Sequence, residues 1–409
     1  MSAGSPALTL PAPTDVAARV TDRVPAWLSI AALALGGFGI GTTEFATMGV
    51  LPLVTGDLGA TIPQGGRLVS AYALGVVVGA PLLAVAGARL PRKVLLLVLM
   101  GAFTAGNLLS ALAPSFGWLL VARFASGLPH GAYFGIASIV AASLVPPDRR
   151  ARAVARVMLG LTVANIVGVP LATLLGQQLG WRSTYVAVAV IGVLTIAAVA
   201  RLVPRVAALP GASPLRELGA LRRPQVWLTL LVGAVGFGGF FAVYSFITPT
   251  LVEETGLAES GVPAALVLFG LGMTLGTEVG GRLADRGVVR TIATGMGGVL
   301  LALVAFSLTV QHVVGAMVGI FLISALGSLT LPALQTRLMD VAGDAQSLAA
   351  AGNHASLNVG NALGALLGGA VLAAGYGYTA PALVGAVLAG LGLLVLAASV
   401  ALERRTART

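Results

Sequence analysis

Twelve long apolar segments, separated by short polar joints, run through the 409 residues of this chain. Each segment has about 20 residues or more, enough to cross a hydrocarbon core of about 30 Å as an α-helix. A backbone inside lipid must satisfy its own hydrogen-bonding groups, so we expect each segment to be helical. The segments cover residues 26–52, 67–86, 94–113, 117–144, 153–178, 183–203, 225–252, 262–281, 291–310, 313–335, 347–373 and 378–401. The sequence therefore predicts an all-α integral membrane protein with twelve transmembrane helices.

The positive charges lie almost entirely in alternate joints. If both chain ends are on one side, that side carries 21 of the 24 Lys and Arg residues. The opposite side keeps only Arg67 and Arg182, and Arg123 lies inside a segment. By the positive-inside rule, both termini are expected to be cytoplasmic. The formal charge of +10 is spread over seven short joints, which indicates membrane orientation and no nucleic-acid partner.

The two halves of the chain match each other when one is shifted by 197 residues. The matched pairs are Gly36 and Gly233, Gly39 and Gly236, Gly41 and Gly238, Pro52 and Pro249, Gly75 and Gly272, Gly79 and Gly276, and Arg89 and Arg286. We interpret these pairs as a duplication, although close helix packing alone accounts for any single glycine. Two repeated six-helix halves are typical of transporters that hold their substrate between the halves near the bilayer midplane.

This duplication predicts five parts. Two pseudo-symmetric six-helix bundles are expected at 26–203 and 225–402, with a cytoplasmic linker at 204–224 between them. Residues 1–25, rich in Pro, Ala, Ser and Thr, are expected to form a disordered cytoplasmic tail, and 403–409 a second tail.

Ionisable residues inside the predicted membrane spans are the first candidates for function. Glu44 lies within the first span, where an acid at the bilayer centre costs roughly 2.5 to 3.5 kcal/mol and should face the bundle interior or water. Such a carboxyl can bind and release protons, or it can make a structural hydrogen bond or ion pair. Arg123 and His130 share one face of the fourth span, and the depth of Arg123 allows a pair with Glu44. Glu278, near the cytoplasmic end of the eighth span, is expected to pair with an arginine in a structural role.

A second set of polar and aromatic side chains is a candidate substrate site. His354, Asn358 and Asn361 form one polar stripe on the eleventh span, and Asn165 adds an amide from the fifth. Such amides either line a cavity or join helices, a contact worth about 0.6 to 2 kcal/mol. His130 is likewise either a substrate donor or a helix-to-helix hydrogen bond. Aromatic residues that favour an amphiphilic ligand are Phe45, Tyr72, Tyr133, Phe241 and Tyr244.

Several enzyme chemistries lack their residues in this sequence. The single lysine, Lys93, follows Arg92, so there is no phosphate-binding Gly-Lys-Ser/Thr loop. None of the three histidines is followed by Glu, no Gly-x-Ser-x-Gly occurs, and cysteine is absent. We therefore expect no enzyme, metal or cofactor, and energy from an ion gradient, the substrate gradient or a partner.

Short stretches of glycine, proline and charged residues recur along the spans and joints. They are Thr43-Glu44-Phe45 with Gly49 and Pro52; Ala88-Arg89-Leu90-Pro91-Arg92-Lys93; Arg123 to Gly131 with its Pro-His-Gly ending; Gly168-Val169-Pro170 followed by Gly176; Gly281-Arg282-Leu283-Ala284-Asp285-Arg286; Asn353-His354; and Asn358 to Asn361. Together and in this order, they resemble the major facilitator superfamily over nearly the whole chain. The resemblance is to its twelve-helix drug:proton antiporters of the chloramphenicol- and sugar-efflux type.

This resemblance implies roles for the stretches. Gly281 to Arg286 is similar to the family's cytoplasmic motif, in which Asp285 and Arg286 would latch the halves in the outward-open state. The first half departs from the pattern because Ala88 stands in place of the Asp, although the cations Arg89, Arg92 and Lys93 remain. Arg123 to Gly131 is similar to the motif linked to proton transfer. Gly168, Pro170 and Gly176 are similar to the motif that marks export.

The resemblance and the residues together predict an export antiporter of the bacterial inner membrane. A proton from outside would protonate Glu44 and release a small amphiphilic drug or metabolite outward, with chloramphenicol-like compounds as the first choice. The alternatives are a sugar or nucleoside exporter of the same fold and a non-transporting membrane receptor. We expect a monomer whose partners are its small-molecule substrate, protons and the lipid bilayer.

Overall fold

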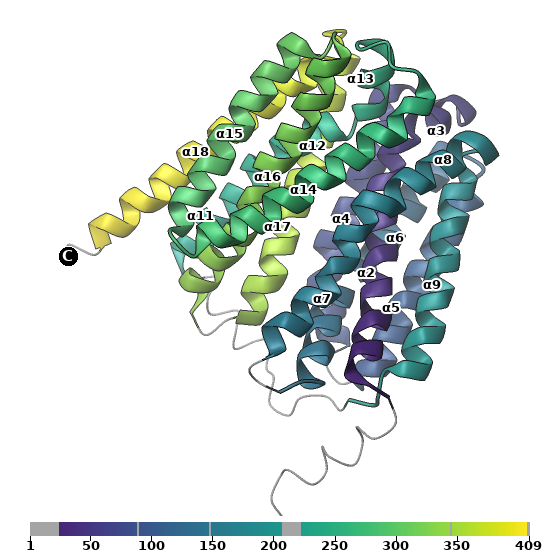
Figure 1. Cartoon of the computed structure of the whole chain (residues 1–409), viewed down its shortest axis with the longest axis vertical. Helices are drawn as coiled ribbons and strands as arrows, with labels where there is room; N and C mark the ends of the chain where they lie inside the picture. The colour runs from purple at the N-terminus through teal and green to yellow at the C-terminus, as the bar shows by residue number, and fades with distance from the viewer. Residues whose placement is uncertain (1–23, 88–89, 147–148, 207–221, 344–345, 407–409) are drawn as a thin grey trace, which may run out of the picture.

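The computed structural model describes residues 24–87, 90–146, 149–206, 222–343 and 346–406, and these residues are almost wholly helical (Figure 1). Nearly all of the tail expected at 1–25 and most of the linker expected at 204–224 lie outside the described residues, as do Ala88 and Arg89. The predicted all-α fold is confirmed.

The helices of the first half follow the order expected from the apolar segments. They are α2 (Ala26–Gly49), α3 (Leu51–Asp57), α4 (Ile62–Ala86), α5 (Arg92–Ala111), α6 (Phe116–Ser143), α7 (Arg150–Val163), the π-helical η2 (Ala164–Gly168), α8 (Val169–Leu179) and α9 (Arg182–Leu202). The first span thus continues into the short helix α3, and the fifth is divided by η2.

The second half repeats this order. Its helices are α11 (Pro224–Leu231), the π-helical η4 (Val232–Gly236), α12 (Gly238–Tyr244), α13 (Ile247–Glu253), the 3-10 turn η5 (Glu259–Gly261), α14 (Val262–Ala284), α15 (Val288–Thr309), α16 (Val313–Ala342), α17 (Gln346–Ala373) and α18 (Ala380–Thr406). The helix α18 continues past residue 402, where the sequence places the end of the second bundle.

Eleven of the described helical stretches are long and apolar enough to cross a membrane. The one expected span outside that group is the fourth, which corresponds to the 28-residue helix α6. This helix carries Arg123 and His130 in its interior, and both side chains are buried by the protein.

The two halves form two bundles that lie side by side, with the first half in purple to teal and the second in green to yellow (Figure 1). A core of the first half contains Leu33, Phe103 and Tyr133. The core of the second half also takes in Phe45 and Met48 from α2. The halves therefore share a continuous apolar interface at this level.

Glycines that match between the halves allow close helix packing. A Cβ atom added at Gly75 or Gly79 of α4 would meet a backbone carbonyl of α6. Their counterparts in α14, Gly272 and Gly276, would likewise meet backbone carbonyls of α16. Because a backbone carbonyl cannot turn aside as a flexible side chain can, these four positions hold the helix pairs at their observed separation.

We expect Gly127→Ala to lower the free energy of unfolding by about 1 to 3 kcal/mol, because the new methyl group would meet the carbonyl oxygen of Tyr72 in α4. The matched control is Gly135→Ala in the same helix, where a Cβ meets nothing within 4 Å. Alanine there should be neutral or stabilising by about 0.5 to 1 kcal/mol, because it favours the helix. Thermal unfolding of the purified variants compares them, and equal midpoints would contradict the packing role.

One end of the molecule is formed by α3, α13 and the loops beside them, and is here called the distal end. At this end, equivalent acids in the two halves accept hydrogen bonds from neighbouring residues. Asp57 Oδ2 accepts hydrogen bonds from Arg182 (2.6 Å) and from the Trp181 Nε1–H (3.0 Å). In the second half, Glu254 Oε1 accepts from the backbone N–H of Tyr378 at 3.3 Å. Glu254 and Tyr378 lie 197 residues beyond Asp57 and Trp181, so the contact repeats with the duplication. The hydrogen bonds from Arg182 and Trp181 lower the pKa of Asp57.

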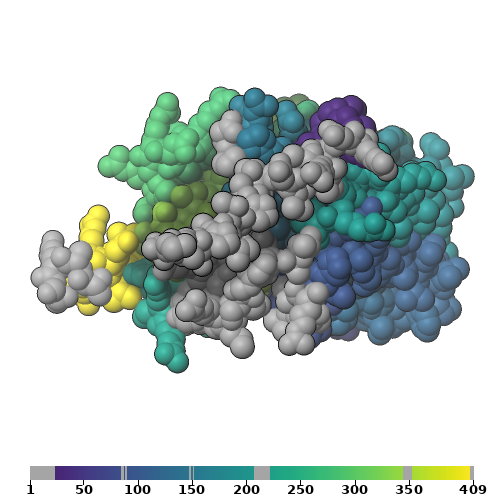
Figure 2. Space-filling view, turned by 90° about the horizontal axis from the view of Figure 1, so that it is seen from below, coloured from purple at the N-terminus to yellow at the C-terminus, as the bar shows by residue number. Residues whose placement is uncertain are grey.

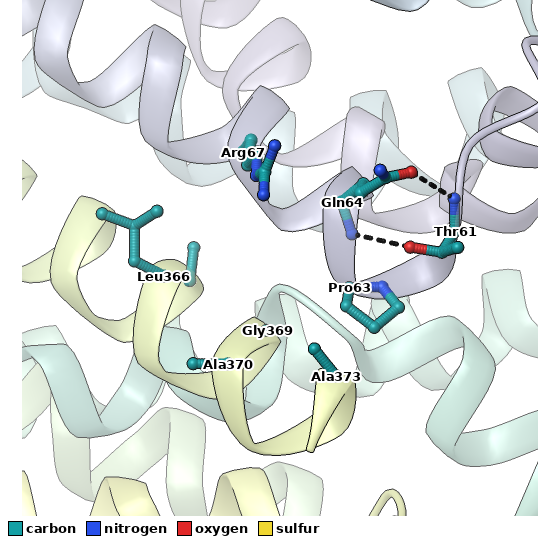
Figure 3. Close-up of a pocket in the computed structure, with 9 residues that line it drawn as sticks. Thr61, Pro63, Gln64, Arg67, Leu366, Gly369, Ala370 and Ala373 are labelled. Atoms are coloured by element: carbon teal, nitrogen blue, oxygen red, sulfur yellow. Dashed lines mark hydrogen bonds between the residues drawn. The ribbon is translucent and has the colours of Figure 1, made fainter. Parts of the chain in front are cut away.

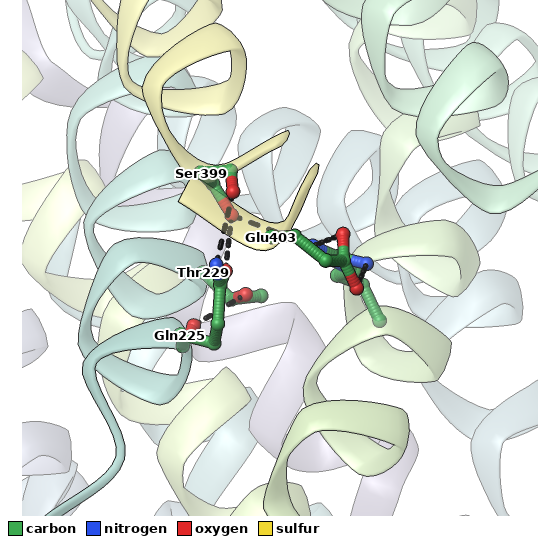
Figure 4. Close-up of polar contacts among 5 residues, drawn as sticks. Gln225, Thr229, Ser399 and Glu403 are labelled. Atoms are coloured by element: carbon green, nitrogen blue, oxygen red, sulfur yellow. Dashed lines mark hydrogen bonds and ion pairs between the residues drawn. The ribbon is translucent and has the colours of Figure 1, made fainter. Parts of the chain in front are cut away.

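A polar cluster joins α11, α16 and α18 at the other end of the second half (Figure 4). Arg337, which is buried, donates to both carboxylate oxygens of Glu403 at 3.2 and 2.8 Å. Ser399 donates to Gln225 Oε1 at 2.6 Å, and Gln225 Nε2 donates back to the Ser399 carbonyl at 2.9 Å. The two-pronged arginine contact fixes the relative position of these helix ends.

Candidate functional site

Hydrogen bonds between the two halves lie toward the distal end. The hydroxyl of Thr248 donates to the carbonyl oxygens of Met48 (2.9 Å) and Gly49 (3.2 Å), where α2 ends and its last carbonyls lack helical partners. Ser70 Oγ donates to the Ala362 carbonyl at 3.1 Å, and Gln177 Nε2 donates to the Glu259 carbonyl at 2.8 Å. Within the part of the chain that the structure describes, these hydrogen bonds close the distal end.

The contact between α4 and α17 belongs to the same closure. A hollow of about 350 Å³ lies between the distal ends of these helices, and Arg67 and Gly369 are among its lining residues (Figure 3). The turn before α4 is held by a reciprocal pair of hydrogen bonds. Gln64 Oε1 accepts from the Thr61 N–H at 2.8 Å, and Thr61 Oγ1 accepts from the Gln64 N–H at 3.3 Å.

The Gly-Val-Pro stretch of the fifth span coincides with a π-helical turn. The turn η2 ends at Gly168, and Pro170 lies in the first turn of α8. Because proline has no N–H, the regular hydrogen-bond pattern cannot continue through it, and π turns often mark functional sites. A Cβ at Gly168 would meet Thr42 of α2, and one at Gly270 of α14 would lie 2.5 Å from the Asn165 carbonyl oxygen. This turn therefore lies between α2 of its own half and α14 of the other.

Glu44 lies on α2 between the halves. Its side chain is buried, and the residue is only 7% exposed. The ring of the next residue, Phe45, stacks on Phe241 with centroids 6.1 Å apart and meets Tyr244 edge-on at 5.6 Å. Among the described residues, no hydrogen bond or ion pair is made by the Glu44 carboxyl. An acid is therefore held at the interface of the halves without a bonded partner.

Arg123 is fully buried and lies within electrostatic range of Glu44. Its guanidinium donates to the Thr43 hydroxyl at 3.1 Å and to the Thr43 carbonyl at 3.2 Å. It lies over the Tyr72 ring at 4.4 Å. The Thr43 hydroxyl in turn donates to Asn107 Oδ1 at 2.5 Å. The pair that the sequence allows between Glu44 and Arg123 is not an ion pair in the described structure, because the cation binds the residue before the acid.

A chain of rings links the fourth span to the eleventh. His130 Nδ1 lies 3.1 Å from the Tyr72 hydroxyl, and the His130 ring contacts Phe134 one turn further along α6. The Phe134 ring stacks on His354 of α17, with centroids 6.1 Å apart and an angle of 1° between planes. Of the aromatic candidates, Tyr133 meets the Phe134 ring edge-on with centroids 6.2 Å apart, but its hydroxyl donates to the Leu33 carbonyl within the first-half core.

Three buried asparagines have free acceptor atoms. Asn165 Nδ2 donates to the Leu161 carbonyl at 3.0 Å, and Asn358 Nδ2 donates to the His354 carbonyl at 2.9 Å. A carbonyl can only accept, so each amide nitrogen must face it and the Oδ1 atom must point elsewhere. Within the described residues, the Oδ1 atoms of Asn165, Asn358 and Asn361 have no hydrogen-bond partner. Each unmade bond costs about 1 to 3 kcal/mol, so these oxygens are ready acceptors for a donor group.

The described residues of the two expected latch motifs lie at the end opposite the distal end. Lys93 Nζ donates to the Ala200 carbonyl at 2.7 Å, and the Arg92 backbone N–H donates to Val206. Glu278 pairs with Arg282 at 2.7 Å on the exposed surface, where such pairs add little stability. Asp285 and Arg286 follow at the end of α14. The structure brings neither of them to Glu44.

Four residues of this region are not among the candidate site residues, although Thr43 belongs to the quoted stretch Thr43-Glu44-Phe45. Thr43 accepts a hydrogen bond from Arg123, and Asn107 accepts one from the Thr43 hydroxyl. Phe134 connects the rings of His130 and His354, and Phe269 stacks on Tyr244 with centroids 3.8 Å apart. Phe134 follows His130 by four residues, a spacing that places both on one helix face. Spacing along the chain gives no comparable indication for Asn107 or Phe269, because they come from other helices.

Comparison with known proteins identifies the family to which this architecture belongs. The family model of the Major Facilitator Superfamily matches residues 33–310 and 237–409. Inner membrane transport protein YdhP of Escherichia coli K12 is 43% identical over 89% of this chain and 94% of its own length. The chloramphenicol resistance protein of Streptomyces lividans is 36% identical over the same shares. A probable sugar efflux transporter of Mannheimia succiniciproducens is 27% identical over 92% of this chain and 94% of its own length.

Solved structures share the fold at low sequence identity. A peptide transporter crystallised with alafosfalin superposes with a TM-score of 0.75 over 96% of this chain and 98% of its own, at 14% identity. A bacterial homologue of the human lysosomal transporter Spinster, inward-facing and unoccupied, gives 0.71 over 92% and 95%, at 18% identity. From these matches and its two six-helix halves, the chain belongs to the major facilitator superfamily and is a membrane transporter rather than an enzyme.

Proposed function

We propose that this transporter exports small amphiphilic compounds in exchange for protons and that Glu44 is the proton-binding group. The observation that carries the proposal is the buried Glu44 carboxyl, which lies between the halves and lacks a bonded partner among the described residues. Burying an acid at that depth costs free energy, so its presence there indicates a function. Because Arg123 is held beside it by Thr43, a fixed cation can balance the charge when Glu44 loses its proton.

The closure at the distal end corresponds to one stage of the proposed transport cycle. With both termini in the cytoplasm, as the distribution of Lys and Arg predicts, the distal end faces outward. The described state is then closed to the outside, and substrate reaches the midplane from the cytoplasm. Protonation of Glu44 from outside follows when the halves rock to the opposite state, and it releases the substrate.

The rings around Glu44 support an amphiphilic substrate. Phe45, Phe241 and Tyr244 offer apolar faces next to the acid, and the free amide oxygens offer acceptors for hydroxyl or N–H groups. Chloramphenicol-like compounds have both kinds of surface and are our first choice. A relative with 36% identity is a chloramphenicol resistance protein, which supports the same choice.

A sugar or nucleoside exporter is the second candidate. The three unpartnered asparagine oxygens favour it, since a polyol supplies several hydroxyl donors. A relative described as a probable sugar efflux transporter covers 92% of this chain. The two candidates differ in whether the aromatic rings or the amides contribute most of the binding.

A susceptibility panel in a pump-deficient bacterial host tests the proposal, with chloramphenicol-like compounds first. We expect the wild-type protein to raise the inhibitory concentration of at least one compound, and Glu44→Gln to restore full sensitivity. Glu278→Gln is the matched control, because it removes an exposed acid whose partner is Arg282. Equal protection by wild type and Glu44→Gln, at equal amounts in the membrane, would contradict proton coupling through Glu44.

A further inference from the structure

Two adjoining hollows lie along α2 and α7, away from the candidate site. The larger, about 740 Å³, is a mainly apolar groove lined by Trp27, Leu35 and Phe38 of α2 and by Leu159 and Val163 of α7, among others. The smaller, about 190 Å³, shares Trp27, Ile30 and Arg156 with the groove and adds Arg149 and Arg152. Seen from below, the beginning of α2 in purple lies beside the beginning of α7 in blue (Figure 2).

The groove exists because α2 and α7 approach each other closely behind it. A Cβ at Gly160 would meet the Ala34 carbonyl oxygen, so the backbones touch there. Larger side chains then rise on either side, and Leu159 and Val163 are 54% and 46% exposed. Apolar side chains exposed at this depth face lipid, which makes the groove a place where an acyl chain can lie.

Two of the cations at the groove, Arg152 and Arg156, have no polar partner among the described residues. Arg152 and Arg156 are both exposed and lie four residues apart, so they share one helix face. Among the described residues, neither makes a hydrogen bond or an ion pair. Residues 148–156 carry four arginines against one acid, Asp148, which lies outside the described residues. The smaller hollow therefore carries the positive charge that an anion needs.

The dimensions match one leaflet of a bilayer. From Trp27 to Phe38 the helix rises about 16 Å, half of a hydrocarbon core of about 30 Å. The arginines then lie at the level of the lipid headgroups. Trp27, 61% exposed at the start of α2, has the position of an interfacial tryptophan.

We propose that this surface binds an anionic phospholipid, with the lipid phosphate on Arg152 and Arg156 and one acyl chain in the groove between α2 and α7. Guanidinium groups suit phosphate oxygens because they donate in a planar fork. A free phosphate ion would use the arginines but leave the apolar groove without a role, and an apolar ligand would leave the arginines without one. An anionic lipid uses both, and basic sites between membrane helices bind such headgroups.

Native mass spectrometry of the full-length, delipidated protein tests the proposal. The protein is mixed with equal amounts of phosphatidylglycerol and phosphatidylcholine that carry the same acyl chains, and the ratio of the two in the first bound lipid is measured. We expect the wild type to prefer phosphatidylglycerol by a factor on the order of ten, because each cation near a headgroup strengthens binding. Arg152→Gln with Arg156→Gln should bring the ratio close to one.

Two further variants separate the site from a general surface charge. Arg404→Gln with Arg405→Gln removes the same charge from exposed residues of α18 and should keep the wild-type ratio. Ala31→Phe fills the groove without changing charge and should reduce the amount of tightly bound lipid severalfold. A preference that survives in the Arg152 and Arg156 variant, or is lost equally in the Arg404 and Arg405 variant, overturns the proposal. So does unchanged lipid binding by Ala31→Phe.

Discussion

Glu44→Gln is expected to abolish proton-driven substrate accumulation in inside-out vesicles, to the level of vesicles without the protein. The amide has nearly the same shape as the acid, so the packing of Phe45 against Phe241 and Tyr244 should remain. It cannot take up or lose a proton under physiological conditions, so a gradient can no longer act through this position. The measurement is uptake of a compound identified in the susceptibility panel, driven by an imposed pH gradient.

The control for this prediction is the folding of the variant. Because the described structure gives the Glu44 carboxyl no hydrogen bond to lose, we expect a thermal midpoint close to that of the wild type. Substrate binding in the absence of a gradient should also persist. Normal gradient-driven uptake by Glu44→Gln would remove this residue from the coupling role.

Arg123→Met is expected to abolish proton-driven uptake as well, and to lower the free energy of unfolding by about 1 to 3 kcal/mol. The methionine cannot donate to the Thr43 carbonyl, which would be left as a buried acceptor without this donor. It also removes the charge that balances Glu44 after deprotonation. Uptake in vesicles and thermal unfolding in detergent measure the two effects separately.

Arg337→Met is the matched control for Arg123→Met. Arg337 is also a buried arginine, but its partner is Glu403 at the far end of the second half. Its removal should cost about 1.5 to 3 kcal/mol, because the half-exposed Glu403 loses two charge-assisted hydrogen bonds, and coupling should survive in the folded fraction. Arg123→Lys keeps the charge and should retain part of the uptake. If Arg123→Met transports normally, the cation has no part in coupling.

A double-mutant comparison connects the two predictions. If Arg123 acts through the charge of Glu44, adding Glu44→Gln to Arg123→Met should recover part of the lost stability, because the neutral amide no longer needs the cation. Since Glu44→Gln alone is expected to be nearly neutral, independent roles would leave the double variant as stable as Arg123→Met alone.

The spans could be predicted from the sequence because lipid leaves few alternatives. A run of about 20 apolar residues in lipid forms a helix, because its backbone must satisfy its own hydrogen bonds. The 197-residue repeat indicates that the helices are organised into two halves. Local interruptions were harder to predict. The breaks at Val50 and around Ser245, and the π turns η2 and η4, lie within segments that stay apolar throughout, so apolar periodicity does not record them.

The candidate site could be predicted in its residues but only partly in its contacts. The polarity of Glu44, Arg123 and His130 makes them conspicuous in an apolar span, so their burial follows from the cost of exposing charge to lipid. Which partner each one takes depends on side-chain reach across helices. Arg123 binds Thr43 instead of Glu44, and His130 meets Tyr72, because the neighbouring helices place those oxygens within hydrogen-bond distance.

The central claim, that one buried acid exchanges a proton for substrate, is tested most directly by following internal pH in proteoliposomes. A pH-sensitive dye is enclosed with an imposed pH gradient, and the exported compound is then added. The wild type should dissipate the gradient only when the compound is present, and Glu44→Gln should leave the gradient unchanged by it. Substrate-dependent proton flow of equal rate through Glu44→Gln would contradict the account.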